Sequence, residues 1–262
     1  MNDPKNMVHA FAVARRTHGL VAPQWLDPLM DFSQAYGLQE SVRMELGAKV
    51  VGWKVAAPPS ADVISAPLFD TGCIDSASDL LDAAVLRDGL ECELALLIER
   101  PLPMGGCTRD DVMGAVGTVM PAFELLCSRL PGKFTSPRQH LVADCLGHGG
   151  VVLGAPCATW KTQDLANLHV ALWNDAAPIT VKQASNPFGD PLLAVALLAN
   201  HLAERGQSIA PGTFVLAGSH TGVYRPQPGE RLRCVFEGIG EVALNLREAA
   251  SINSKEDSDA CR

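Results

Sequence analysis

The alternation of apolar and polar positions predicts a helical N-terminal portion followed by a short strand. Apolar residues recur near the helical period in one early stretch, and a glycine that can end the helix follows them: Phe32, Ala35, Tyr36, Val42, Leu46 and Gly47. The next run, residues 49–56, is rich in β-forming residues. Its alternate apolar side chains fall on one face of an extended chain, which leaves Lys54 on the other face.

Further along the chain the pattern changes mostly to strands. One helix is expected from the capping pair Thr108 and Asp111 to Gly117, and another from Asp190-Pro191 to Gly206. The expected strands are residues 90–98, a run that Pro121 opens, a run ending near 154, and residues 213–219, 231–237 and 241–246.

This order of elements, helices first and mostly strands later, predicts an α+β fold rather than a repeating βαβ chain. A turn cluster at residues 75–79 indicates a boundary, so we expect residues 1–80 to form a helical or α/β portion and residues 81–248 the larger domain. Residues 249–262 are polar and aperiodic, which predicts a disordered tail.

Composition and charge narrow the class of protein. The chain has 262 residues, 47% hydrophobic and 19% charged, which is typical of soluble globular proteins. A net charge of −8 without a basic run excludes nucleic acid or an anionic membrane as the main partner. The chain start lacks the order of a secretory signal, so we expect a cytoplasmic protein. Its eight cysteines lack a CxxC pair and predict free thiols rather than a zinc site.

The most informative chemistry is a pair of glutamates inside an apolar strand. Glu91 and Glu93 are two residues apart, so an extended chain points both carboxylates to the same face. Partly buried carboxylates repel, and a strand tolerates them when one is protonated or a cation lies between them. A third acid, Glu124, is flanked by apolar residues in another expected strand. Three carboxylates suit a hard cation such as Mg²⁺ or Mn²⁺, although a Glu-x-Glu pair alone is more often a solvated sheet face.

Other polar candidates each carry two interpretations. Lys54 is either an exposed lysine on an edge strand or a cation that stabilises an enolate oxygen beside a metal. Asp144 is either a turn residue or a group that moves a proton or positions water. His148 and His220 stand beside glycine and serine in expected loops, where histidines are more often structural than catalytic.

Several segments occur in an order that resembles a known family. They are GWKVA, SAPLFD, ECELALLIE, VMPAFELLCSR, LVADCLGHGG, the block from FGDPLL to LAGSHTG, and PGERLRCVFEGIGEVAL. Over residues 10–247 they resemble the 2-oxopent-4-enoate hydratase and 4-oxalocrotonate decarboxylase family of the fumarylacetoacetate hydrolase superfamily. The resemblance implies the mixed β-roll of that superfamily, with its catalytic domain in residues 81–248, a smaller N-terminal α/β portion and a homo-oligomer.

The resemblance also implies a set of site residues. It implies Mg²⁺ or Mn²⁺ ligands at Glu91, Glu93 and Glu124, and catalytic roles for Lys54 and Asp144. The residues that would bind substrate are Asp70, His148, Ser219 and Thr221. The chain departs from the family pattern around the expected pocket, with Cys127 in place of Asp, Cys145 in place of Asn, His148 in place of a small polar residue and His220 at an often apolar position.

The implied reaction is the hydration of a 2-hydroxy-2,4-dienoate to a 4-hydroxy-2-oxo acid, as in the degradation of aromatic compounds. The substrate would be a small 2-oxo acid or its enol. Three alternatives stay open: decarboxylation of a 2-oxo diacid such as 4-oxalocrotonate, hydrolysis of a carbon–carbon bond, and a non-catalytic binding or scaffold subunit that retains the metal site.

Overall fold

Two β-sheets organise the chain in the computed structural model, which describes residues 4–27, 30–56, 62–75, 80–175 and 177–248. The seven-stranded sheet has the order β2-β1-β10-β5-β6-β7-β3, and the five-stranded sheet the order β4-β12-β11-β8-β9. Parallel pairs (β1 with β10, β3 with β7, β4 with β12) stand among antiparallel ones, so both sheets are mixed.

The strands of the larger sheet are β1 (Val50–Ala56), β2 (Ile64–Phe69), β3 (Cys73–Asp75), β5 (Gly89–Ile98), β6 (Val116–Leu126), β7 (His148–Leu153) and β10 (Phe214–Leu216). Those of the smaller sheet are β4 (Leu80–Leu81), β8 (His169–Asn174), β9 (Ala177–Gln183), β11 (Arg231–Phe236) and β12 (Gly240–Leu246). The larger sheet takes strands from both sides of residue 80, so the two expected portions share one sheet. The expected tail, residues 249–262, lies outside the described residues.

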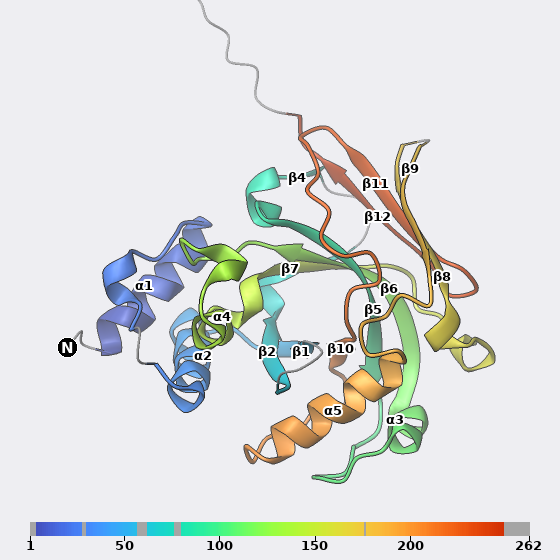
Figure 1. Cartoon of the computed structure of the whole chain (residues 1–262), viewed down its shortest axis with the longest axis horizontal. Coiled ribbons are helices and arrows are strands. Elements are labelled where there is room, and N and C mark those ends of the chain that lie inside the picture. Colours follow the sequence, from blue (N-terminus) through green and yellow to red (C-terminus); the bar gives the residue numbers. More distant parts are fainter. Residues whose placement is uncertain (1–3, 28–29, 57–61, 76–79, 176, 249–262) are drawn as a thin grey trace, which may run out of the picture.

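The helices form two groups beside the sheets (Figure 1). They are α1 (Pro4–Thr17), α2 (Phe32–Leu46), α3 (Arg109–Ala115), α4 (Arg138–Ala143) and α5 (Pro191–Ala203). Helices α1, α2 and α4 pack together at one end of the molecule, whereas α3 and α5 pack on each other near the opposite end of the larger sheet. The expected α+β fold with mixed sheets is confirmed.

Local sequence signals explain where two of these helices begin and end. The Asp31 side chain accepts a hydrogen bond from the Gln34 backbone N–H at 2.7 Å, and the Gln34 side chain accepts one from the Asp31 N–H at 2.9 Å. This capping box opens α2, and Gly47 ends the helix with a left-handed φ of 65°, as predicted. The predicted capping pair Thr108 and Asp111 opens α3.

The predicted boundary between α3 and the strand after it is wrong. The helix ends at Ala115 rather than Gly117, and β6 begins at Val116 rather than at Pro121. Pro121 lies inside β6, where pairing with β7 begins only at Ala122. The proline therefore interrupts no backbone hydrogen bond between β6 and β7, and β6 continues on both sides of it.

Five strands (β2, β3, β4, β8 and β9) and one helix are not predicted by the sequence. Strand β9 lies at the edge of the smaller sheet and most of its side chains are exposed, so no apolar alternation marks it. Its antiparallel neighbour β8 and the short helix α4 were missed with it. The expected loop at His148 is also incorrect, because that residue opens β7.

Side chains on one face of β5 build the main core. Cys92, Leu94, Leu96 and Ile98 are fully buried in a cluster that joins both sheets, α3 and α5. This is the predicted apolar face of the strand, and Glu91 and Glu93 therefore point to the opposite face. A second cluster packs α1, α2 and α4 on β2. None of the described helices combines the length and apolar character needed to cross a bilayer.

Candidate metal centre and substrate cavity

Strand pairing brings the three glutamates together. In the antiparallel register of β5 and β6, Glu91 lies directly opposite Glu124, and Glu93 lies opposite Ala122. One carboxylate oxygen of each glutamate lies within 4.8 Å of the others. The cluster is therefore fixed by the backbone of two central strands rather than by a loop.

Burial makes this cluster electrostatically costly. Glu93 and Glu124 are buried and Glu91 is half-buried. Loss of hydration and the charge of Glu124 raise the pKa of Glu91, and they raise the pKa of Glu93 well above its usual value. Burial also raises the pKa of Glu124, against the opposing effect of Lys54. A positive charge among these groups would stabilise all three.

The donor set fits a divalent cation. Glu93 accepts one hydrogen bond from the Gly218 N–H at 2.9 Å. The Oε2 atom of Glu124 is buried without a hydrogen-bond partner among the described residues. An orphan carboxylate oxygen is unfavourable, and a hard cation is a partner that would satisfy it and offset the repulsion together.

Lys54 is the basic partner of the cluster. It lies on β1, between β2 and β10, and 7% of its surface is exposed, which excludes the exposed edge-strand alternative. Its Nζ donates to Glu124 Oε1 at 2.5 Å and to the Leu146 carbonyl at 3.4 Å. Burial acts to lower the pKa of Lys54, but Glu124, Glu91 and Glu93 outweigh it and raise the pKa. The side chain is therefore an ammonium.

A left-handed turn shapes the chain beside Lys54. Cys145, Leu146 and Gly147 have successive φ values of 51°, 53° and 73°. This conformation is strained for residues with a side chain and is more accessible to Asn and Gly. It directs the Leu146 carbonyl to Lys54 while the Leu146 side chain lines the cavity.

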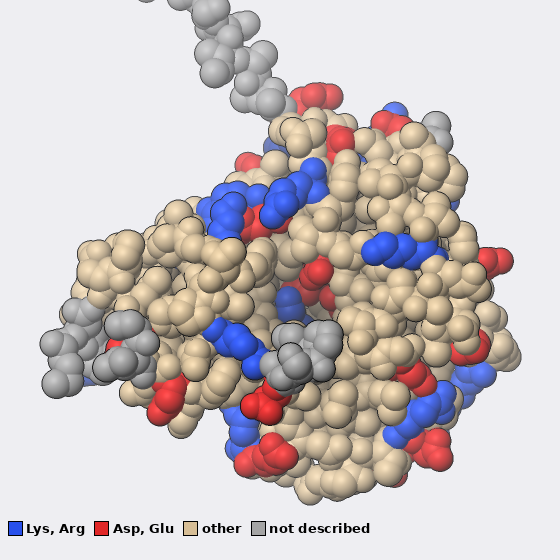
Figure 2. Space-filling view, in the orientation of Figure 1, with Lys and Arg blue, Asp and Glu red and all other residues tan. Residues whose placement is uncertain are grey.

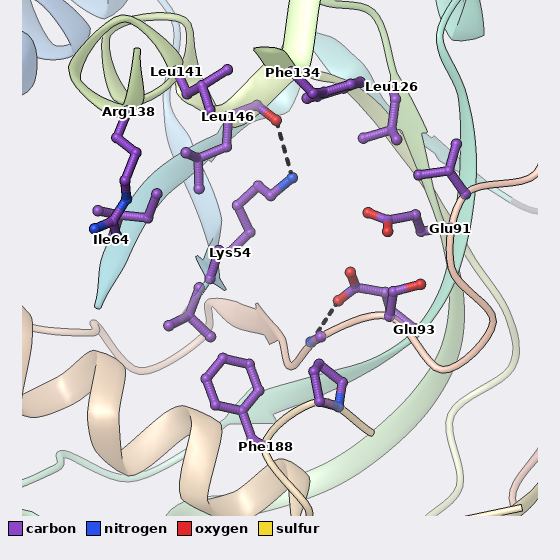
Figure 3. A pocket seen from close by; sticks show the side chains of 16 residues that line it. Lys54, Ile64, Glu91, Glu93, Leu126, Phe134, Arg138, Leu141, Leu146 and Phe188 are labelled. Carbon is purple, nitrogen blue, oxygen red and sulfur yellow. Dashed lines mark hydrogen bonds between the residues drawn. The ribbon is translucent and has the colours of Figure 1, made fainter. Parts of the chain in front are cut away.

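A cavity of about 460 Å³ opens in front of the cluster. Figure 2 shows a hollow near the centre of this face with acidic and basic atoms inside it. In Figure 3, Glu91 and Glu93 lie on one side of the cavity, and Lys54 extends toward its centre. The opposite wall is mostly apolar and carries one charged side chain, Arg138. Of the predicted substrate residues, Ser219 lines the cavity and hydrogen-bonds Glu91.

The other predicted substrate residues do not line this cavity. Asp70 is exposed and accepts a hydrogen bond from the Lys49 N–H at 3.0 Å. The Thr221 hydroxyl accepts one from the Cys92 N–H at 3.3 Å. His148 is buried, with its Nδ1 at 3.7 Å from Glu124 Oε1. Burial and nearby cations hold the pKa of His148 well below its usual value, so its ring is neutral.

Asp144 is engaged in a buried ion pair. Its Oδ1 lies 2.5 Å from Nε of Arg129, and its Oδ2 accepts hydrogen bonds from the Ser128 hydroxyl and the Arg129 N–H, both at 2.9 Å. Arg129 also donates to the carbonyls of Cys127 and His148. Asp144 is therefore more than a turn residue that bonds its own backbone. Its pair with Arg129 links the segment after β6 to the start of β7.

His220 is buried rather than a surface loop residue. Asn186 donates to its Nε2 at 3.2 Å, and its ring packs edge-on against Phe236. Burial lowers the pKa of His220 to about 4. The side chain is therefore neutral at physiological pH, and its contacts with Asn186 and Phe236 are those of a residue packed in the protein interior.

Arg138 and two phenylalanines, Phe134 and Phe188, are cavity residues that sequence reasoning missed. Arg138 opens the short helix α4 and stands in no charge pattern or motif. Its position in the cavity depends on contacts between segments far apart in the chain, and local sequence does not carry that information.

Comparisons with known proteins find relatives over most of the chain. No protein-family model matches the chain. A 4-oxalocrotonate decarboxylase of Pseudomonas putida is 29% identical over 236 residues, 84% of this chain and 87% of that protein. A 2-hydroxyhexa-2,4-dienoate hydratase of Comamonas testosteroni is 28% identical over 234 residues, 84% and 88% of the two chains.

Solved structures show the same fold. The 4-oxalocrotonate decarboxylase of Pseudomonas putida G7, complexed with calcium and acetate, superposes with a TM-score of 0.82 at 25% identity and covers 93% of this chain and 96% of that one. A fumarylpyruvate hydrolase of Pseudomonas aeruginosa, in complex with Mn²⁺ and pyruvate, has a TM-score of 0.56 at 14% identity over 75% and 89% of the two chains. The predicted β-roll is confirmed by these likenesses.

Proposed function

Because the chain is a homologue of 4-oxalocrotonate decarboxylases and 2-keto-4-pentenoate hydratases, with structural neighbours in the fumarylacetoacetate hydrolase family, we propose that it is a metal-dependent hydratase. Its substrate class would be a 2-hydroxy-2,4-dienoate. Ketonisation followed by addition of water to the remaining double bond gives a 4-hydroxy-2-oxo acid. The observation that carries the proposal is the buried cluster of three glutamates and Lys54 at the wall of a cavity.

Each residue of the site would have a distinct role in this reaction. Glu91, Glu93 and Glu124 would hold Mg²⁺ or Mn²⁺, which supplies Lewis-acid stabilisation of enolate charge. Lys54, an ammonium fixed before the substrate arrives, would stabilise negative charge on the substrate oxygen. Ser219 would contact the bound acid from the cavity wall. Both carboxylate oxygens of Asp144 already bind Ser128 and Arg129, so Asp144 is not available to move a proton. Together with Arg129 it would instead position the turn at Leu146.

The decisive test measures divalent-ion binding and turnover in the same protein samples. Removal of Glu91 in a Glu91→Ala variant should abolish divalent-ion binding and lower turnover of 2-hydroxypenta-2,4-dienoate by at least about 100-fold, the scale of losing a main electrostatic stabiliser. Glu241→Ala, on the exposed surface of β12, is the control and should keep both properties. Full activity in metal-free protein would show that the proposal is wrong.

Decarboxylation of a 2-oxo diacid is the second candidate. It is favoured by the 29% identity and the TM-score of 0.82 to 4-oxalocrotonate decarboxylases. The same lysine and glutamates would stabilise the enolate left when CO₂ departs. An assay that follows CO₂ release and hydrated product in one reaction separates the two activities. A non-catalytic binding subunit would bind Mg²⁺ and give neither product.

Assembly and location are also part of the proposal. We propose a homo-oligomer, supported by Leu193 and Leu197 on α5, which are each 42% exposed. A cytoplasmic location is supported by buried free thiols, those of Cys92, Cys107, Cys127, Cys145 and Cys234. The partner molecule would be a small 2-oxo acid or its enol.

A further inference from the structure

The wall of the cavity opposite the glutamates carries a cation that the proposed chemistry does not use. Arg138 enters from α4, and its guanidinium lies beside Ile64, across the cavity from Glu91 and Glu93 (Figure 3). Its neighbours on that wall are apolar and include Leu141 and Leu146. A single charged group on an apolar wall is a feature that selects ligands.

Arg138 is held in place without an acidic partner. Its Nη2 donates to the backbone carbonyl of Asp62 at 2.5 Å, and its guanidinium lies 5.8 Å from the ring centroid of Phe32. No carboxylate within the described part of the chain forms an ion pair with it. Its Nε is buried without a partner there, and among the described residues Nη2 is the nitrogen that forms a hydrogen bond, which leaves Nη1 for a ligand. The guanidinium is therefore preorganised, and part of its donor fork is unused.

The unused donors discriminate between two kinds of 2-oxo acid. A ligand that ends in a hydrocarbon tail would cover Arg138 and remove water from an unpaired charge, which is unfavourable. A ligand that ends in a second carboxylate would instead accept charge-assisted hydrogen bonds from the guanidinium. The apolar side chains beside it would strengthen this attraction by excluding water.

We propose that Arg138 binds the second carboxylate of a dicarboxylic substrate and so sets the substrate class of this enzyme. This inference rests on the proposed function, in which the 2-oxo end of the substrate lies at the glutamate cluster. Both candidate reactions accommodate it, as hydration of a dicarboxylic 2-hydroxydienoate or decarboxylation of a 2-oxo diacid. Arg138 is a specificity residue here and takes no part in the bond changes.

The test compares two ligands of equal chain length, 2-oxoadipate and 2-oxohexanoate, which differ in having a carboxylate or a methyl group at the far end. Calorimetric titration of the Mg²⁺-loaded protein should show 2-oxoadipate binding at least about tenfold more tightly, as one charge-assisted contact provides. This comparison needs no variant, so it does not depend on whether a substituted protein folds.

Variants then assign the preference to the residue. Arg138→Met should remove the tenfold preference by weakening 2-oxoadipate and leaving 2-oxohexanoate unchanged, and Arg138→Lys should restore part of it. Gln139→Met, the next residue on α4 and not part of the cavity wall, should bind both ligands as the unsubstituted protein does. Circular dichroism of each variant checks that the fold is retained.

The outcomes separate this inference from the proposed function. Equal binding of both ligands in the presence of Mg²⁺, or a preference that Arg138→Met leaves unchanged, overturns the role of Arg138 and leaves the proposed function standing. Failure of both ligands to bind in the presence of Mg²⁺ overturns the proposed function, and the inference with it.

Discussion

At the scale of single residues, the cavity gathers ionisable groups whose burial opposes ionisation. The carboxyl of Glu93 is buried beside two other carboxyls, and the ammonium of Lys54 is buried beside all three. Such burial is costly for stability, because the loss of hydration of buried charges can exceed the attraction between them. Perturbed groups that meet at a cavity indicate a candidate functional site.

Glu93 makes the stability of the metal-free protein depend on pH. Its folded-state pKa is raised by burial and by Glu124, so its stabilising contribution is present below its unfolded pKa and is lost as pH rises through the folded value. Glu93→Gln replaces the acid with a neutral group that can still accept from the Gly218 N–H. In EDTA, the melting temperature of Glu93→Gln minus that of the unsubstituted protein should therefore be larger at pH 8 than at pH 5. A difference independent of pH would contradict this assignment.

Lys54 should matter for turnover more than for folding. Lys54→Met removes the ammonium and keeps most of the volume, so we expect kcat to fall by about 10²–10³-fold, as for loss of one preorganised electrostatic donor. Lys161→Met, at an exposed lysine beside Trp160, is the matched control and should leave kcat unchanged. Steady-state kinetics at saturating Mg²⁺ measures both. A twofold effect of Lys54→Met would remove Lys54 from the proposed mechanism.

The alternation of a strand made part of this site predictable from sequence. Glu91 and Glu93 share a face because they are two residues apart in an apolar run, and the structure confirms this. The partners of Asp144 and the closeness of His148 to Glu124 arise from contacts between distant segments. Periodicity does not encode such contacts, so the immediate neighbours of Asp144 do not predict its pairing with Arg129.

At the scale of secondary-structure elements, the pair of Asp144 and Arg129 joins the end of β6 to the end of α4. Removal of one partner leaves the other charge buried and unpaired, so Asp144→Ala should lower the free energy of unfolding by about 3–5 kcal/mol. Glu241→Ala breaks an exposed ion pair with Arg233 and should change it by less than about 1 kcal/mol. Urea unfolding followed by fluorescence measures both values. Equal effects would mean that the Asp144 pair does not hold these elements together.

The C-terminus of α2 offers a test of backbone conformation alone. A Cβ added to Gly47 would meet no atom within 4 Å, but φ there is 65°, so Gly47→Ala should destabilise the protein by about 1–2 kcal/mol. Gly114 has equally open surroundings but lies inside α3, where Gly114→Ala should stabilise by about 0.5–1 kcal/mol. Thermal unfolding of the two variants should therefore shift in opposite directions. Shifts of the same sign would contradict this account.

Helices and strands that carry a local sequence signal, such as a capping box or an apolar face, were predictable. The capping boxes of α2 and α3 and the apolar face of β5 are each written in a few adjacent residues. Strand β9 lacks such a signal because it is an exposed edge strand that pairs through its backbone. From the local sequence, Pro121 predicts the start of a strand, because the pairing that tolerates this proline is set by β7, which comes later in the chain.

At the scale of the whole molecule, the order of helices and strands predicted an α+β fold, but the path of the chain through the sheets was not predictable. The larger sheet places β10 between β1 and β5, although these strands lie far apart in sequence. That insertion positions Gly218, just beyond β10, to donate to Glu93. The site is therefore complete only when β10, from the C-terminal part of the chain, pairs with β1 and β5.

This arrangement predicts that metal binding stabilises the entire domain. The three glutamates come from β5 and β6 at the centre of the larger sheet, so an ion held there would bind the folded chain and not the unfolded one. At a Mg²⁺ concentration of about 100 times Kd, the linkage adds about 2.7 kcal/mol to the free energy of unfolding.

Calorimetric melting should show this increase for the unsubstituted protein when MgCl₂ replaces NaCl at equal ionic strength. Glu124→Gln should melt at the same temperature in both salts, since it removes one ligand and the negative charge that holds the ion. An equal response of the two proteins to MgCl₂ would place the ion elsewhere. No response of either protein would mean that the repulsion in the cluster is relieved by Lys54 and protonation alone, in which case the chain would lack the electrophile that its proposed reaction requires.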